Sequence, residues 1–71
     1  LANDKNGDAL TTRELEVLSL IAAEKGDKEI ASQLEISERT VRYHLERIHE
    51  KLGTITRAGA VAKAIRLNLI S

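Results

Sequence analysis

The 71-residue sequence contains no cysteine, which excludes disulfide bonds and thiolate zinc sites. It contains no proline either, and no apolar run approaches the ~20 residues that a membrane-spanning helix needs. No signal peptide is recognisable. A chain this short forms one small domain at most and buries only about 60% of its unfolded surface. Abundant Leu, Ile, Ala, Glu and Lys predict a compact all-α fold.

Other shortages bear on cellular context. The lack of cysteine is compatible with a reducing compartment, and we expect a cytoplasmic protein that does not contact membranes. The chain begins with Leu1 rather than Met, so we expect a fragment of a longer protein.

Charge is balanced in number but not in position. Residues 1–38 contain four Lys or Arg and nine Asp or Glu, a net charge of −5, whereas residues 39–71 contain seven and two, a net charge of +5. A neutral chain is untypical of nucleic-acid-binding domains, which are often strongly basic. The second half nevertheless predicts attraction to an anion, although chance segregation on a solvated surface is an alternative.

Capping residues and apolar periodicity predict four helices with short connections. Residues 1–9 are polar, include Asn-Gly and are expected to be a linker end, and residues 10–71 are expected to form the domain. Thr11 and Glu14 form a capping box at the start of the first helix, and Gly53 is placed to end the third. The expected helices cover residues 12–24, 28–35, 38–52 and 57–67.

The third expected helix has one narrow apolar stripe. At 100° per residue, its apolar side chains fall within a wedge of about 60°; they are Val41, Leu45, Ile48 and Leu52. Tyr43, the only aromatic residue in the chain, points almost directly away from that wedge, beside Arg39, Arg42 and Arg47. Arginine matches phosphate and guanine oxygens, and a helix fits the major groove of DNA. An incidental exposed tyrosine is the alternative.

The second and third helices have the spacing of a helix-turn-helix over about residues 27–46. Ala31 takes the small position at which the second helix of the motif crosses closely, and the turn has room for only three or four residues. The surrounding apolar set is Ile30, Leu34, Ile36 and Val41. Alanine-rich helical pairs can mimic this pattern.

The full arrangement resembles the LuxR/FixJ-type DNA-binding domain of bacterial transcription regulators. The similar segments are "LTTRELEVLSLIA" (10–22), "KEIASQLEIS" (28–37), "TVRYHLERIHEKLG" (40–53) and "RAGAVAKAIRLNLI" (57–70). They occur in the family's order without gaps and cover everything after the expected linker. The resemblance implies sequence-specific binding of double-stranded DNA, with residues 38–52 as the recognition helix in the major groove.

The resemblance also implies roles for individual residues. The positions that usually contact bases are occupied by Arg42, Tyr43 and Glu46. Those expected to contact phosphate are Lys28, Arg39, Thr40, Arg47 and Lys51. Ala58 and Ala62, a turn apart on the last helix, are candidates for a two-fold homodimer contact on a palindromic site, although packing within one subunit is an alternative. An N-terminal regulatory domain is the expected partner within the whole protein, and RNA polymerase is a further candidate partner.

Four positions depart from the family pattern. Glycine is usual at the position of Glu24 and frequent at that of Glu35, where a left-handed conformation would cost about 1 kcal/mol. Many members have lysine in place of Arg42, whose planar group adds a second hydrogen-bonding prong. Glu46 repels phosphate but can accept a hydrogen bond from cytosine. We therefore expect it to narrow the range of DNA sequences that are bound, at some loss of DNA affinity.

Other function classes have weaker support. His44 and His49 lie about 140° apart around the third helix and cannot share a metal or a substrate. The Glu46-x-x-His49 spacing resembles half of a carboxylate metal site, but the sequence contains no second half. We therefore expect no metal, no cofactor and no enzyme activity. The remaining alternatives are a protein-interaction module and a sigma-type helical domain.

Overall fold

The computed structural model describes residues 9–71, which fold into four α-helices without strands. The helices are α2 (Thr12–Ala22), α3 (Asp27–Leu34), α4 (Glu38–Leu52) and α5 (Arg57–Arg66). The all-α, four-helix prediction is confirmed, whereas nearly all of the expected linker, residues 1–9, lies outside the described residues. None of the helices in residues 9–71 has the length and apolar composition that a membrane span requires.

Local hydrogen bonds define where three of the helices begin. The Thr11 hydroxyl accepts a hydrogen bond from the Glu14 N–H at 3.1 Å, and the Glu14 carboxylate accepts one from the Thr11 N–H at 2.9 Å, so the predicted capping box is present. The Ser37 hydroxyl caps α4 through the Thr40 N–H, and the Thr56 hydroxyl caps α5 through the Gly59 N–H.

Helix ends depend on left-handed residues, two of which are glutamates. Glu24 has a φ of 65° and Glu35 a φ of 59°. Each follows the end of a helix, where the last carbonyls accept hydrogen bonds from the next N–H groups in a Schellman motif. α2 therefore ends at Ala22, two residues before the predicted end, because Glu24 has already left the helical conformation. Gly53, which is predicted to end the third helix, is left-handed, and so is Asn68.

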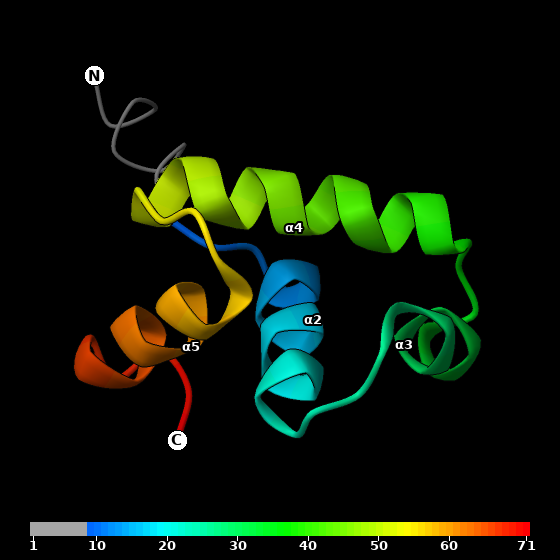
Figure 1. Cartoon of the computed structure of the whole chain (residues 1–71), viewed down its shortest axis with the longest axis horizontal. Helices are drawn as coiled ribbons and strands as arrows, with labels where there is room; N and C mark the ends of the chain where they lie inside the picture. Colours follow the sequence, from blue (N-terminus) through cyan, green and yellow to red (C-terminus); the bar gives the residue numbers. More distant parts are fainter. Residues whose placement is uncertain (1–8) are drawn as a thin grey trace.

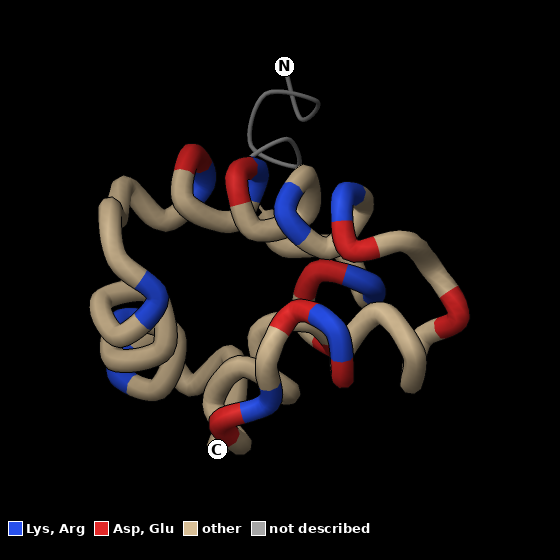
Figure 2. The backbone as a smooth tube through the Cα atoms, turned by 45° about the vertical axis from the view of Figure 1, so that its right-hand side comes forward, with Lys and Arg blue, Asp and Glu red and all other residues tan. Residues whose placement is uncertain are grey.

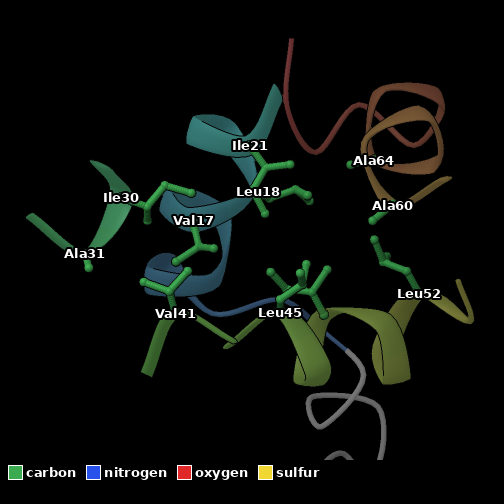
Figure 3. Close-up of a cluster of buried hydrophobic side chains, with 11 residues drawn as sticks. Val17, Leu18, Ile21, Ile30, Ala31, Val41, Leu45, Leu52, Ala60 and Ala64 are labelled. Atoms are coloured by element: carbon green, nitrogen blue, oxygen red, sulfur yellow. The ribbon is translucent and has the colours of Figure 1, made fainter. Parts of the chain in front are cut away.

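One apolar core joins all four helices. α2 lies in the middle, and α3 and α5 lie on either side of it beneath the long α4 (Figure 1). Figure 3 shows apolar side chains from every helix directed into one space. The predicted stripe of α4 is buried: Val41 and Ile48 are fully inaccessible, and Leu45 and Leu52 nearly so. α5 contributes the small side chains of Ala60 and Ala64.

Candidate nucleic-acid interface

The packing of α4 leaves its polar side open. Because α2, α3 and α5 all lie on one side of α4 (Figure 1), the residues opposite the apolar stripe face solvent. Tyr43 is 57% exposed, and the Arg42 side chain is 56% exposed. Arg39 and Glu46 are exposed on the same side of the helix. The Tyr43 ring therefore contributes little to the core and is available to a partner.

α3 and α4 form the predicted helix-turn-helix, joined by residues 35–37. Ala31 is 7% exposed, in keeping with the close packing that a small residue permits. The turn combines left-handed Glu35 with half-buried Ile36, whose N–H donates to the Ala31 carbonyl at 2.9 Å. Ser37 then starts α4. Rigid packing of these elements fixes the direction in which the exposed side of α4 points.

α4 carries charges of both signs along its length. Figure 2 shows basic and acidic residues interspersed on this helix, whereas all of the charged residues of α5 are basic. Arg47 pairs with Glu50 at 2.9 Å on the surface, a contact that is weak in water and easily exchanged for phosphate. Arg42 lies 4.0 Å from Asp27, the first residue of α3. The charges of Arg42 and Arg47 are thus partly compensated by nearby carboxylates, and Arg39 is exposed.

Lys28, Arg39 and Thr40 lie in the first turns of α3 and α4. Lys28 and Arg39 are each the second residue of their helix and are exposed. Thr40 is half-buried, and its hydroxyl lies 2.9 Å from that of Ser37. N–H groups at a helix start favour anions, so these positions suit phosphate.

Lys51 differs from the other predicted phosphate-contacting residues, because its charge is engaged inside the protein. Its ammonium donates to Glu14 Oε1 at 2.8 Å and to the Ala9 carbonyl at 3.1 Å. The two side chains are only 8% and 5% exposed. A phosphate contact by Lys51 would have to break this buried pair, so the pairing disfavours the expected contact, which stays a prediction.

The electrostatics of Glu14 follow from this pairing. Burial by itself raises the pKa of the Glu14 carboxyl, but hydrogen bonds from Lys51 and the Thr11 N–H, together with the positive charges of Lys51 and Arg47, outweigh it. The net effect lowers the pKa of Glu14 below its ordinary value of 4.5. Glu14 is therefore ionised in the folded protein at neutral pH.

The two histidines do not meet in one site. His44 is half-buried beside Tyr43, with ring centroids 5.8 Å apart. His49 Nδ1 lies 2.9 Å from the Thr54 hydroxyl, across the end of α4. Within residues 9–71, no three His, Asp or Glu side chains are grouped in a way that could hold a metal ion.

The outer side of α5 is apolar and open. Ala58 and Ala62 are exposed, while Ala60 and Ala64 provide the packing within the subunit. Ala58 and Ala62 line a hollow of about 560 Å³ together with Val61, Ile65 and residues from the end of α2. The alternative that Ala58 and Ala62 serve the internal core is not supported by their exposure.

Two acidic residues form ion pairs that the sequence patterns do not predict. The sequence predicts Glu14 as part of a helix cap but not as the partner of Lys51, 37 positions away, and it predicts no long-range contact of Asp27. Asp27 instead contacts arginines of α4 and α5. A composition or periodicity signal for such contacts does not exist, because they arise only when the helices pack.

Known proteins with similar sequences and structures share this arrangement. Residues 8–64 match the family model described as bacterial regulatory proteins, luxR family. The spore germination protein GerE of Bacillus subtilis is 48% identical over 58 residues, which is 82% of this chain and 78% of GerE. The probable transcriptional regulatory protein NarL of Mycobacterium tuberculosis is 44% identical over 61 residues, 86% of this chain but only 28% of NarL.

Solved structures agree with the sequence matches. The structure of the transcription factor GerE superposes with a TM-score of 0.84 and 40% identity, covering 87% of this chain and 92% of GerE. The response regulator ChrA, from a heme-sensing two-component system, gives a TM-score of 0.85 and 39% identity, and this chain spans 31% of it. The expected resemblance is confirmed by these matches: the chain belongs to the LuxR family of bacterial regulatory proteins, as a helix-turn-helix DNA-binding domain.

Proposed function

We propose that this domain binds double-stranded DNA in a sequence-specific manner, with α4 in the major groove, as part of a bacterial transcription regulator. The observation that carries the proposal is the placement of α2, α3 and α5 on one side of α4, which leaves Arg42 and Tyr43 exposed on the other. A helix free along one side has the diameter that the major groove accommodates.

Base recognition is assigned to Arg42, Tyr43 and Glu46. Arg42 can donate two hydrogen bonds to a guanine edge, Tyr43 can pack on a thymine methyl group, and Glu46 can accept from a cytosine amino group. All three are exposed on α4. The acidic Glu46 opposes phosphate, so it favours discrimination over raw affinity.

Phosphate contacts are assigned to Lys28, Arg39, Thr40 and Arg47. These residues surround the helix-turn-helix, three of them in first turns whose N–H groups favour anions. Phosphate contacts orient the protein but carry no sequence information. Lys51 is left out of this set because of its buried pairing with Glu14.

A two-fold homodimer through α5 on a palindromic site is the proposed assembly. Ala58 and Ala62 are small and exposed, which allows two α5 helices to approach closely, and the adjacent apolar hollow would be covered by the contact. A two-fold protein dimer is complementary to a site with two-fold symmetry.

The rest of the regulator is proposed from its relatives. NarL and ChrA are more than three times as long as the matched region, and ChrA is described as a response regulator. A regulatory domain N-terminal to Leu1 would control when this domain binds, and RNA polymerase would be the partner that receives the signal. Binding chromosomal DNA would place the protein in the bacterial cytoplasm.

The test is a selection from random duplexes followed by titration of the selected site and of a scrambled control. Affinity is expected to fall steeply with salt, since bound phosphates release counterions. Arg42→Ala is expected to cost about 1–3 kcal/mol on the selected site and little on the scrambled one. Arg13→Ala, which removes an arginine on α2, is the matched control. No association with any duplex at low salt would refute the proposal.

A further inference from the structure

One carboxylate connects three helices of the domain. Asp27, the first residue of α3, lies 2.6 Å from Nη2 of Arg57, the first residue of α5. Its other oxygen lies 4.0 Å from Nη1 of Arg42 on α4. The Asp27 side chain is 21% exposed, and that of Arg42 is 56% exposed. An inward acidic group thus faces one of the arginines assigned to base recognition.

The carboxylate retains unused hydrogen-bonding capacity. Asp27 Oδ1 is buried and accepts no hydrogen bond of good geometry, so the close Arg57 group is a charge contact without alignment. The 4.0 Å separation from Arg42 likewise leaves an ion pair without a hydrogen bond. An ionised carboxylate offers about four acceptor positions. Arg42 is therefore attracted to Asp27 but not locked by it.

We propose that Asp27 is a positioning residue that sets sequence discrimination through Arg42. The proposal rests on the proposed function and identifies how the same surface distinguishes a specific site from random duplex. Asp27 holds the Arg42 guanidinium toward the α3 end of α4, which restricts its orientations. To contact DNA, Arg42 has to give up part of its attraction to Asp27.

This competition acts unequally on the two kinds of DNA. A random duplex offers Arg42 mainly phosphate, whose negative charge also repels Asp27. A guanine edge in the correct place accepts both prongs of the guanidinium and is uncharged, so Asp27 does not repel it. The carboxylate consequently weakens binding to random duplex more than binding to the specific site. Arg57 completes the arrangement by fixing Asp27 from α5.

The experiment measures the ratio of affinities for the selected site and a scrambled duplex in Asp27→Asn. We expect random-duplex binding to tighten about five-fold at low salt, the equivalent of one unit-charge contact at 4 Å in water. The affinity for the selected site is expected to change less, so the ratio falls. Glu16→Gln is the matched control: it removes one negative charge from a surface pair with Arg13, and the ratio is expected to stay within two-fold.

A double-mutant cycle with Arg42→Ala separates positioning from general structure. In the Arg42→Ala background, Asp27→Asn is expected to leave the ratio unchanged within two-fold. An unchanged ratio in the single variant, or an equal fall in both backgrounds, would overturn the positioning role while leaving the DNA-binding function intact. Absence of any DNA binding by the parent domain would overturn both.

Folding of each variant is checked by thermal unfolding. If Asp27→Asn does not fold, Asp27→Glu carries the test, because it keeps the charge and moves the carboxylate by one methylene. Its ratio is then expected to fall when Arg42 is present and to stay unchanged in the Arg42→Ala background. A fall in both backgrounds would again contradict the proposal.

Discussion

Replacement of Lys51 by methionine removes the positive half of the buried pair between α2 and α4. Methionine keeps most of the length and the apolar stem, so the principal loss is the ammonium. Glu14 is then left 4% exposed with the Thr11 N–H as its remaining hydrogen bond in this cap. Leaving a buried carboxylate without its counter-ion is one of the few kinds of substitution that destabilise a protein strongly.

The magnitude follows from the burial of both partners. Removing one member of a buried pair costs about 3–5 kcal/mol, because the other charge is left desolvated. A domain of this length has a total stability of about 4–11 kcal/mol at 0.05–0.15 kcal/mol per residue. Lys51→Met is therefore expected to remove between about a quarter and all of the free energy of unfolding at pH 7.

The pH dependence provides a sharper test. In the parent domain the pKa of Glu14 is lowered from 4.5 in the folded state, so its stabilisation is present above that value and is lost as the pH falls. In Lys51→Met, burial without the ammonium raises the folded pKa, and stability is instead lost as the pH rises. Urea unfolding followed by far-UV circular dichroism from pH 4 to pH 8 measures both curves, and the difference between them is expected to shrink towards pH 4.

Lys28→Met is the matched control, because Lys28 is exposed and undergoes the same chemical change. Its stability is expected to stay within about 0.5 kcal/mol of the parent, whereas its log–log salt slope for DNA falls by about 0.9. Lys51→Met should show the reverse. A loss below about 1 kcal/mol, with a reduced salt slope, would refute the structural role and restore Lys51 as a phosphate contact.

Three further substitutions test other parts of the molecule. Glu35→Gly should stabilise the domain by about 1 kcal/mol in urea unfolding, because glycine adopts the left-handed conformation without strain; a loss of stability would contradict this. His44→Ala should lower the melting temperature, because the side chain is half-buried, and should leave the ratio of affinities for specific and random duplex nearly unchanged. An unchanged melting temperature with a lowered affinity ratio would make His44 a base-contacting residue. Ala62→Asp should weaken cooperative binding to a palindrome without unfolding the monomer, as seen in gel-shift titrations; unchanged cooperativity would exclude the α5 contact.

Features set by neighbouring residues were predictable from the sequence. The capping box of Thr11 and Glu14 and the buried stripe of α4 depend on spacings of three or four residues, which the α-helix itself fixes. The family resemblance was carried by the same local spacings. The exception was the end of α2, where left-handed Glu24 ended the helix early, because glutamate gives no warning of that conformation.

Contacts between distant residues were decided by the tertiary structure. Nothing local distinguishes Lys51 from the exposed lysines, yet packing of α2 against α4 buries it on Glu14. Packing likewise brings Asp27 to Arg42 and Arg57. The sequence determined which helices form and which side of each is apolar, since both follow from short-range backbone geometry. Which charges remain free for a partner depended on how the helices meet, since an ion pair forms only between groups that the fold brings together.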